Sequence, residues 1–232
     1  MNVLDLFSGI GGFSLGLERA GMRTVAFCEI DPYCRRVLAR HWPDVPVYDD
    51  VRALRASNLQ ADVVCGGFPC QPFSTASAGK RGGISDDRFL WPEMLRVISE
   101  CRPSWVIGEN VAGIESLALR QVVSDLEGAG YEVAPPFEIP ACAVGHDHRR
   151  SRFWFLAHAN VRGEYGRAVN AKTSILSQFN DDARGVGTPN GVSNRLDRRR
   201  MEALGNAVVP QIPEIIGRAI MMTDHQDRTE GN

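Results

Sequence analysis

Residues 2–12 read NVLDLFSGIGG, and this stretch decides how the rest of the chain is interpreted. The apolar run up to Phe7 has the length of a buried strand, and the glycines that follow favour a tight turn. Apolar residues then recur with helical spacing as far as Ala20, and Gly21 comes next as a typical helix C-cap. The sequence therefore predicts a strand, a glycine turn and a helix in succession.

The same alternation continues along the chain. Further strands are expected at residues 24–30, 45–48, 62–67, 104–109, 131–139 and 152–156, and helices are expected after Asp31 and over 89–100, 114–128 and 210–221. Strands that alternate with helices form a mostly parallel, doubly wound α/β sheet. In such a sheet, ligands bind at the carboxyl ends of the strands.

The composition is that of an ordinary folded protein. The chain has 232 residues, of which 44% are hydrophobic and 23% are charged, and its formal net charge is -2. No apolar run reaches the ~20 residues of a membrane helix and no basic leader opens the sequence, so we expect no membrane partner. The net charge also excludes binding by bulk positive charge, although a local basic groove can still form.

Cysteine usage favours a reducing compartment. The six cysteines include no Cys-x-x-Cys pair and no cluster with histidine at zinc-ligand spacing. We therefore expect a cytoplasmic protein without disulfides and without a metal site.

An acidic residue ends the second expected strand. Glu29 lies twenty positions after Gly9, which is the spacing of a carboxylate that binds the ribose hydroxyls of a nucleoside cofactor. A tight turn beside a surface acid explains the same residues equally well, because the glycine pattern is not a complete Gly-x-Gly-x-x-Gly. Asp50, after the third strand, also has two interpretations: it either binds the amino group of an adenine or caps a helix.

A cysteine stands between two prolines after the fourth expected strand, within residues 66–74, GGFPCQPFS. The prolines hold Cys70 in a stiff loop, outside the packed core. An exposed and rigid thiol favours nucleophilic catalysis, because a thiolate is intrinsically reactive. Residues 75–88 are rich in glycine, serine and charged residues, and are expected to form a loop that closes over substrate.

An acidic residue and two arginines are the remaining candidate functional residues. Glu109 ends the apolar fifth strand, where burial would raise its pKa and keep a proton available; the alternative is a glutamate in solvent. Arg150 and Arg152 alternate into the strand that begins at Arg152, so both point to the same face. Two guanidinium groups on one face repel each other unless an anion or carboxylate lies between them, and the alternative is a solvated charged edge.

These motifs, in this order, resemble those of the 5-methylcytosine DNA methyltransferase family. The most specific parts are DLFSGIGG at 5–12, GFPCQPFS at 67–74, ENV at 109–111 and GNAV at 205–208, and the resemblance covers residues 2–159 and 191–221. It implies a Rossmann-like, S-adenosylmethionine-dependent methyltransferase fold. The expected divisions are a catalytic and cofactor-binding domain (1–159), a short loop-rich target-recognition region (160–194), C-terminal helices that return to the catalytic domain (195–222) and a polar tail (223–232).

The resemblance also implies roles for individual residues. In the family a cysteine adds to C6 of a flipped cytosine, a glutamic acid meets the charge at N3, and an Arg-x-Arg pair orients the base; Cys70, Glu109, Arg150 and Arg152 match these positions. The positions that match family residues for S-adenosylmethionine are Phe7, Gly9, Gly11, Gly12, Glu29, Ile30, Asp50 and Asn206. Those that match DNA contacts are Gln71, Ser74, Lys80 and Arg81.

The implied substrate is double-stranded DNA, and the implied protein is a monomeric prokaryotic or phage enzyme for which a restriction nuclease is a candidate partner. The 35 residues of the recognition region are few for reading bases, which predicts a short target sequence. Three alternatives remain: a cytosine methyltransferase that acts on RNA, a cofactor-binding protein that binds nucleic acid without efficient catalysis, and a nicotinamide-dependent oxidoreductase. The incomplete glycine fingerprint and the proline-flanked Cys70 disfavour the last of these.

Overall fold

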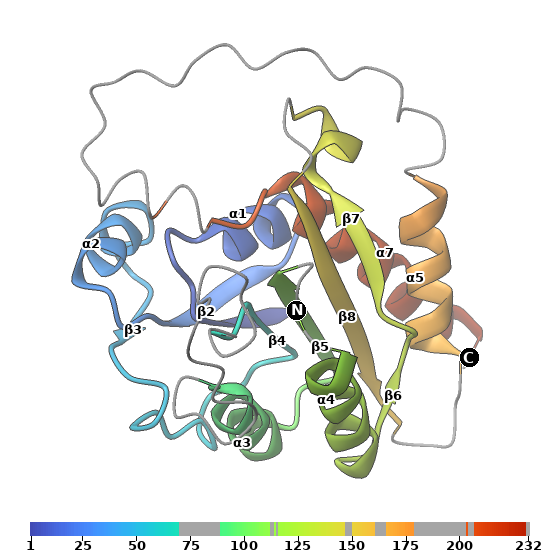
Figure 1. The fold of residues 1–232 in the computed structure, drawn as a ribbon, viewed down its shortest axis with the longest axis horizontal. Coiled ribbons are helices and arrows are strands. Elements are labelled where there is room, and N and C mark those ends of the chain that lie inside the picture. The colour runs from blue at the N-terminus through green and yellow to red at the C-terminus, as the bar shows by residue number, and fades with distance from the viewer. Residues whose placement is uncertain are drawn as a thin grey trace.

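The computed structural model describes residues 1–69, 89–111, 114, 116–146, 150–160, 166–178, 203 and 207–230. Within these residues the chain forms a single eight-stranded sheet with helices on both faces (Figure 1). The doubly wound α/β class is therefore confirmed.

The first half of the sheet is parallel. Its strands are β1 (Asn2–Leu6), β2 (Arg23–Cys28), β3 (Val47–Tyr48), β4 (Val63–Gly66) and β5 (Trp105–Val111), in the spatial order β3-β2-β1-β4-β5. The order reverses between β1 and β4, and ligands bind at such a switch point in doubly wound sheets. The turn after β1 and the loop after β4 therefore start from neighbouring strand ends.

The second half of the sheet is antiparallel. Strand β8 (Ser151–Ala159) pairs with β5 on one side, and with β6 (Tyr131–Val133) and β7 (Phe137–Pro140) on the other. The sequence predicted one strand over 131–139, whereas the structure has two. The break falls at Pro135-Pro136, because proline has no N–H for a strand ladder.

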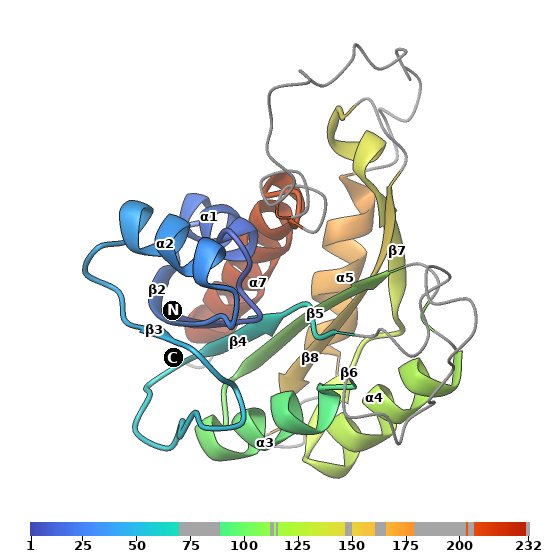
Figure 2. The same cartoon turned by 60° about the vertical axis from the view of Figure 1, so that its left-hand side comes forward.

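Helices cover the two faces of the sheet (Figure 2). Helices α3 (Trp91–Cys101) and α4 (Ser116–Gly128) bury Trp91, Met94 and Leu126 in one hydrophobic cluster. Helices α1 (Gly12–Arg19), α5 (Arg167–Ser177) and α7 (Gln211–Glu230) contribute to the cluster on the opposite face. Helix α2 (Pro32–His41) lies beside α1, and a short 3-10 helix, η4 (Ala141–Val144), follows β7.

Helix α5 lies where the composition predicted loops. Its buried face consists of Ala168, Ala171 and Ile175, all fully buried. Alanine carries little hydrophobic signal, so the helical period is weak in the sequence although the packing is close. Helix α7 likewise continues to Glu230, through most of the expected polar tail, because no glycine or proline interrupts residues 218–230.

Candidate active site

The turn after β1 adopts a backbone that few residues tolerate. Phe7, Gly9 and Gly11 have φ angles of 53°, 54° and 88°, in the left-handed region. A phenylalanine in this region is strained by about 1–3 kcal/mol, and such strain concentrates at ligand sites. The Ser8 N–H donates to the Cys28 carbonyl at 3.2 Å, which ties the turn to the end of β2.

The carboxylate of Glu29 holds this turn directly. One oxygen accepts the Gly9 N–H at 2.7 Å and the other accepts the Asp31 N–H at 2.7 Å, while the residue is 9% exposed. An ionised carboxylate has about four acceptor positions, so each oxygen can still accept a hydroxyl. Ile30, the next residue, is 66% exposed, which is unusual for isoleucine and provides an apolar surface beside the carboxylate. These acceptor oxygens and this apolar surface fit the hydroxyls and the base of a nucleoside.

Asp50 lies beyond the short strand β3, at the same edge of the sheet. Its Oδ1 accepts the Arg52 N–H at 2.9 Å, in a turn of the kind that aspartate favours. The side chain is 38% exposed and therefore accessible to a ligand. Asp50 can therefore stabilise its local turn and still be accessible to a cofactor.

The C-terminal segment packs against the glycine turn, although the two are about two hundred residues apart. A Cβ atom at Gly12 would lie 2.4 Å from the Val208 carbonyl oxygen, so only glycine allows this approach. Asn206, expected in the cofactor site, lies outside the described residues.

Glu109 lies inside β5, with its side chain 13% exposed. Its Oε1 is 2.8 Å from Nε of Arg152 on β8. Arg150 and Arg152 line a small pocket together with Glu109, with a volume of about 10 Å³, room for one water molecule. A carboxylate thus lies in the same pocket as the two arginines, as expected for guanidinium groups on one face. Burial and the charge of Arg152 lower the pKa of Arg150, and the charge of Glu109 partly offsets this effect.

Burial sets the acidity of Glu109. Desolvation raises its pKa to about 6, from an ordinary value of 4.5, although the charges of Arg152 and Arg150 act in the opposite direction. A carboxyl with a pKa near 6 exchanges protons close to neutral pH, which suits an acid catalyst.

The loop after β4 lies against this acid. A Cβ atom at Gly67 would lie 2.9 Å from Oε2 of Glu109, and the Asn110 side-chain N–H donates to the Phe68 carbonyl at 3.1 Å. Pro69 is the last described residue before the gap, so Cys70, Gln71, Ser74, Lys80 and Arg81 lie outside the described residues. The part of this loop that the structure describes thus lies beside Glu109 and Asn110.

Four other cysteines have thiol pKa values too high for a nucleophile at neutral pH. Burial raises the pKa of Cys28 and Cys34 to about 12 and that of Cys101 to about 11, and it raises the pKa of Cys65 well above its ordinary value. These four thiols stay protonated at neutral pH and are poor nucleophiles.

Sequence reasoning missed residues that complete the pocket. Trp154, Val208 and Ile212 also line it. The alternation along β8 could have identified Trp154, since positions 150, 152 and 154 share one face. Val208 belongs to the GNAV motif at 205–208, but nothing in that motif predicts its contact with the pocket, and no local signal marks Ile212, because both positions depend on how the C-terminal segment folds back.

The candidate DNA-reading region is only partly described. Lys172, one of its basic residues, has its ammonium group 5.8 Å from the centre of the Phe137 ring, so it contacts the protein itself. Among the described residues, no cluster of three or more His, Cys, Asp or Glu could hold a metal ion. The described helices include none long and apolar enough to cross a membrane.

Comparison with known proteins gives one family model and several curated relatives that match this chain. A family model described as C-5 cytosine-specific DNA methylase matches residues 1–185. The chain is 37% identical over 166 residues to the type II methyltransferase M2.BsuMI of Bacillus subtilis, which covers 68% of this chain and 42% of the relative. It is 33% identical over 191 residues to M.MspI of Moraxella, which covers 78% of this chain and 45% of the relative. The chain thus spans less than half the length of these curated relatives.

Solved structures agree on the fold. A prophage-encoded Escherichia coli protein, provisionally assigned as a DNA modification methyltransferase, superposes with a TM-score of 0.60 at 29% identity, covering 73% of this chain and 50% of that chain. The Dnmt2 methyltransferase of S. pombe superposes with a TM-score of 0.58 at 22% identity, covering 77% of this chain and 55% of that chain. The second likeness supports the fold alone.

Proposed function

Because the chain belongs to the C-5 cytosine-specific DNA methylases, we propose that it transfers a methyl group from S-adenosylmethionine to C5 of cytosine in DNA. The observation that supports this most directly is the Glu109 carboxyl, whose side chain is largely enclosed by the protein. It is paired with Arg152 and lies against the loop that leads to Cys70.

The chemistry requires a nucleophile, since C5 of cytosine is too weakly nucleophilic to attack a methyl group on sulfonium. The Cys70 thiolate adds to C6 and forms an S–C6 bond, which makes C5 an enamine carbon. After C5 has been methylated, its proton leaves, the S–C6 bond breaks and the aromatic ring is restored. The target base has to leave the duplex stack to present C6 to the thiol.

Glu109 stabilises the charge that this addition creates. Electron density moves to N3 of the cytosine, and a protonated carboxyl can donate its proton there. Its raised pKa, about 6, keeps part of the population protonated near neutral pH. Arg152 fixes the carboxyl through the 2.8 Å ion pair, and Arg150, which immediately precedes β8 and lines the same pocket, orients the base with it.

The glycine turn and the neighbouring strand ends bind the cofactor. Glu29 accepts the ribose hydroxyls, Phe7 and Ile30 flank the adenine, and Asp50 accepts its amino group. Gly9, Gly11 and Gly12 let the backbone approach the ligand, and Asn206 contributes from the C-terminal segment. When bound, S-adenosylmethionine supplies an electrophilic methyl group.

The DNA partner is held mainly through its backbone. Gln71, Ser74, Lys80 and Arg81 follow the nucleophile in the sequence and contact the DNA beside the flipped base. Helix α5 belongs to the packed core, so residues 161–165 and 179–194 are left to read bases. Each good bidentate base contact supplies ~1–3 kcal/mol of discrimination, which favours a target with few fixed positions. We infer that the protein works as a monomer in the cytoplasm, with a restriction nuclease as a candidate partner.

Methyl transfer tests the proposal. Purified protein is incubated with S-adenosylmethionine labelled in the methyl group and with either double-stranded DNA or RNA. We expect label in DNA, at C5 of cytosine, from the wild type and from Cys142→Ser, a control at a half-buried cysteine. Cys70→Ser should transfer none. Label in RNA alone would favour the RNA alternative, and transfer by Cys70→Ser at the wild-type rate would overturn the mechanism.

A further inference from the structure

The loop that contains Asp50 is joined to the sheet by a short strand at the sheet's edge. Strand β3, which leads into it, has only two residues and pairs with β2 at the edge of the sheet. The loop's apolar side chains, Val51 and Leu54, are buried, but apolar packing is not directional. The turn makes hydrogen bonds of its own, from the Arg52 N–H to Asp50 Oδ1 and from the Ala53 and Leu54 N–H groups to the Asp50 carbonyl. Directional contacts from elsewhere are needed to fix this turn relative to the rest of the fold.

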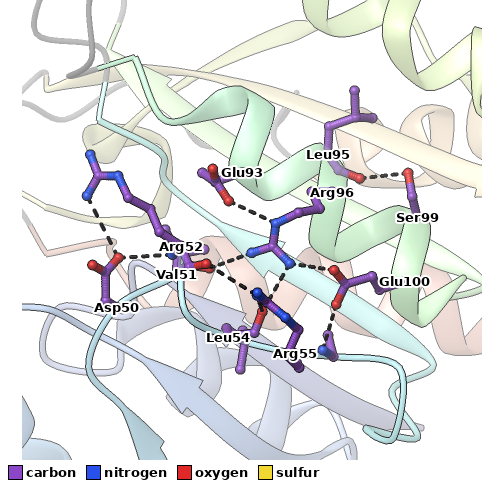
Figure 3. Close-up of polar contacts among 11 residues, drawn as sticks. Asp50, Val51, Arg52, Leu54, Arg55, Glu93, Leu95, Arg96, Ser99 and Glu100 are labelled. Carbon is purple, nitrogen blue, oxygen red and sulfur yellow. Dashed lines mark hydrogen bonds and ion pairs between the residues drawn. The ribbon is translucent and has the colours of Figure 1, made fainter.

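One arginine of helix α3 supplies these contacts (Figure 3). Nη2 of Arg96 donates to the Val51 carbonyl at 2.6 Å, and Nη1 donates to the Leu54 carbonyl at 3.0 Å. The same guanidinium donates to Glu93 through Nε at 2.9 Å and to Glu100 through Nη1 at 2.5 Å. The planar guanidinium group of Arg96 thus links two carbonyl groups of the loop to two carboxylates of α3.

Glu100 extends this network to a third point of the loop. Its Oε2 accepts the N–H of Ala56, a fully buried residue, at 2.8 Å. This hydrogen bond, together with Arg96, holds the pKa of Glu100 below its ordinary value, so the carboxylate stays charged. Residues 51, 54 and 56 are therefore all bonded to α3, and Val51, the first of them, directly follows Asp50.

We propose that Arg96 is a positioning residue for adenine recognition, which fixes the loop so that the Asp50 carboxylate meets the exocyclic amino group of the cofactor. This inference rests on the proposed function, because it assumes that Asp50 binds adenine. Arg96 acts through the backbone and does not touch the ligand. Lysine cannot replace it, since an ammonium is a point charge without the planar fork that reaches two carbonyls and two carboxylates together.

Calorimetry with two ligands tests this role. One ligand is S-adenosylhomocysteine, and the other is S-inosylhomocysteine, in which oxygen replaces the amino group. The proteins are the wild type, Arg96→Ala, Arg96→Lys, Asp50→Ala and the Asp50→Ala/Arg96→Ala double variant. Arg120→Ala, at an exposed arginine of α4, is the matched control. Circular dichroism establishes which variants are folded. If Arg96→Ala does not fold, the binding measurements on Arg96→Lys test the role of Arg96.

We expect Arg96→Ala and Arg96→Lys to weaken binding of S-adenosylhomocysteine by about tenfold or more, on the scale of a lost charge-assisted hydrogen bond. Binding of the inosine analogue should change little, so the preference for adenine should shrink. In the Asp50→Ala background, removing Arg96 should have no further effect. Equal losses for both ligands, or additive losses in the double variant, would overturn the role of Arg96. A wild type that binds neither ligand would instead overturn the proposed function, and an unchanged Asp50→Ala would overturn the role of Asp50.

Discussion

Oε1 of Glu109 and Nε of Arg152 lie 2.8 Å apart across two neighbouring antiparallel strands. In the register of β5 and β8, Glu109 is opposite Trp154 and Val111 is opposite Arg152, so the ion pair is a diagonal one on a single face. The sheet ladder fixes both backbones, and the pair therefore keeps its geometry independently of any loop. A carboxyl group held in this way is preorganised before any ligand binds.

Replacing Glu109 should lower the rate of methyl transfer more than it changes the stability of the fold. Glu109→Gln keeps the shape of the side chain but removes the ionisable proton, so we expect turnover to fall by ~10²–10⁴-fold, the range for general acid–base groups. The measurement is steady-state transfer of labelled methyl groups to DNA. Glu138→Gln, at an exposed glutamate of β7, is the control and should turn over like the wild type. Equal turnover in Glu109→Gln would assign Glu109 a structural role only.

The same residue predicts a pH dependence of stability. Burial raises the pKa of Glu109 from 4.5 to about 6, so the folded protein keeps this proton at pH values where the unfolded chain has released it. Its contribution to stability is therefore greatest at low pH and decreases as the pH rises through this window. Each pKa unit corresponds to about 1.4 kcal/mol, which gives about 2 kcal/mol in total.

Urea unfolding of the wild type and of Glu109→Gln across this range measures that contribution. The difference in unfolding free energy should shift by about 2 kcal/mol in favour of the variant between about pH 4 and about pH 7. Burial also raises the pKa of Asp5, to about 7, but Asp5 titrates in both proteins and cancels in the difference. A difference that does not vary with pH would show that the Glu109 pKa is not raised.

Glu29 should matter for both the cofactor and the turn. Glu29→Ala removes the acceptor of the Gly9 and Asp31 N–H groups, and we expect a loss of stability of about 1–3 kcal/mol. Binding of S-adenosylhomocysteine should weaken by a similar free energy, measured by calorimetry below the unfolding temperature. Asp49→Ala is the control, because that side chain is 74% exposed and its ion pair with Arg35 contributes little. Unchanged affinity in Glu29→Ala would exclude a contact with the ribose.

Two glycine substitutions test the packing of the C-terminal segment. A Cβ atom at Gly16 of α1 would lie 2.2 Å from the Pro210 carbonyl oxygen, so Gly16→Ala should destabilise the protein by about 1–3 kcal/mol through overpacking. A Cβ atom at Gly128, at the end of α4, would meet no other atom within 4 Å, and Gly128→Ala should leave stability equal or slightly raised. Thermal unfolding of both variants gives the comparison. A neutral Gly16→Ala would show that α7 is not packed closely against α1.

Much of the fold could be predicted from the sequence, because local signals mark it strongly. The cap at Asp31 is one example: its side chain accepts the N–H groups of Tyr33 and Cys34, as Asp followed by proline predicts. The parallel sheet follows from the alternation of apolar runs with helices. Helix α5 could not be predicted in this way, because an alanine-rich face gives almost no periodic signal.

The candidate site was predictable where a motif carries the chemistry. Glu109, Arg150 and Arg152 were each identified from residue type and position, and the structure brings them to one pocket. Arg96 could not be identified, because its contacts are with carbonyl groups about forty residues away and no sequence pattern records them. Long-range packing of this kind depends on the tertiary fold and not on local residue types.

We propose that Cys70 forms a covalent bond to cytosine C6 during methyl transfer to DNA. It can be tested with DNA in which 5-fluorocytosine replaces every cytosine, so that the recognition sequence need not be known. The fluorine on C5 cannot leave as a proton does, and the S–C6 bond therefore cannot break once C5 is methylated.

The decisive measurement is a denaturing gel of protein incubated with this DNA and S-adenosylmethionine, followed by mass spectrometry of the peptide that contains residues 66–74. We expect a complex that survives denaturation, with the adduct on Cys70, for the wild type and for Cys142→Ser, and no complex for Cys70→Ser. An equal amount of complex with Cys70→Ser, or methylation of ordinary DNA by a wild type that is never trapped, would show that Cys70 is not the nucleophile.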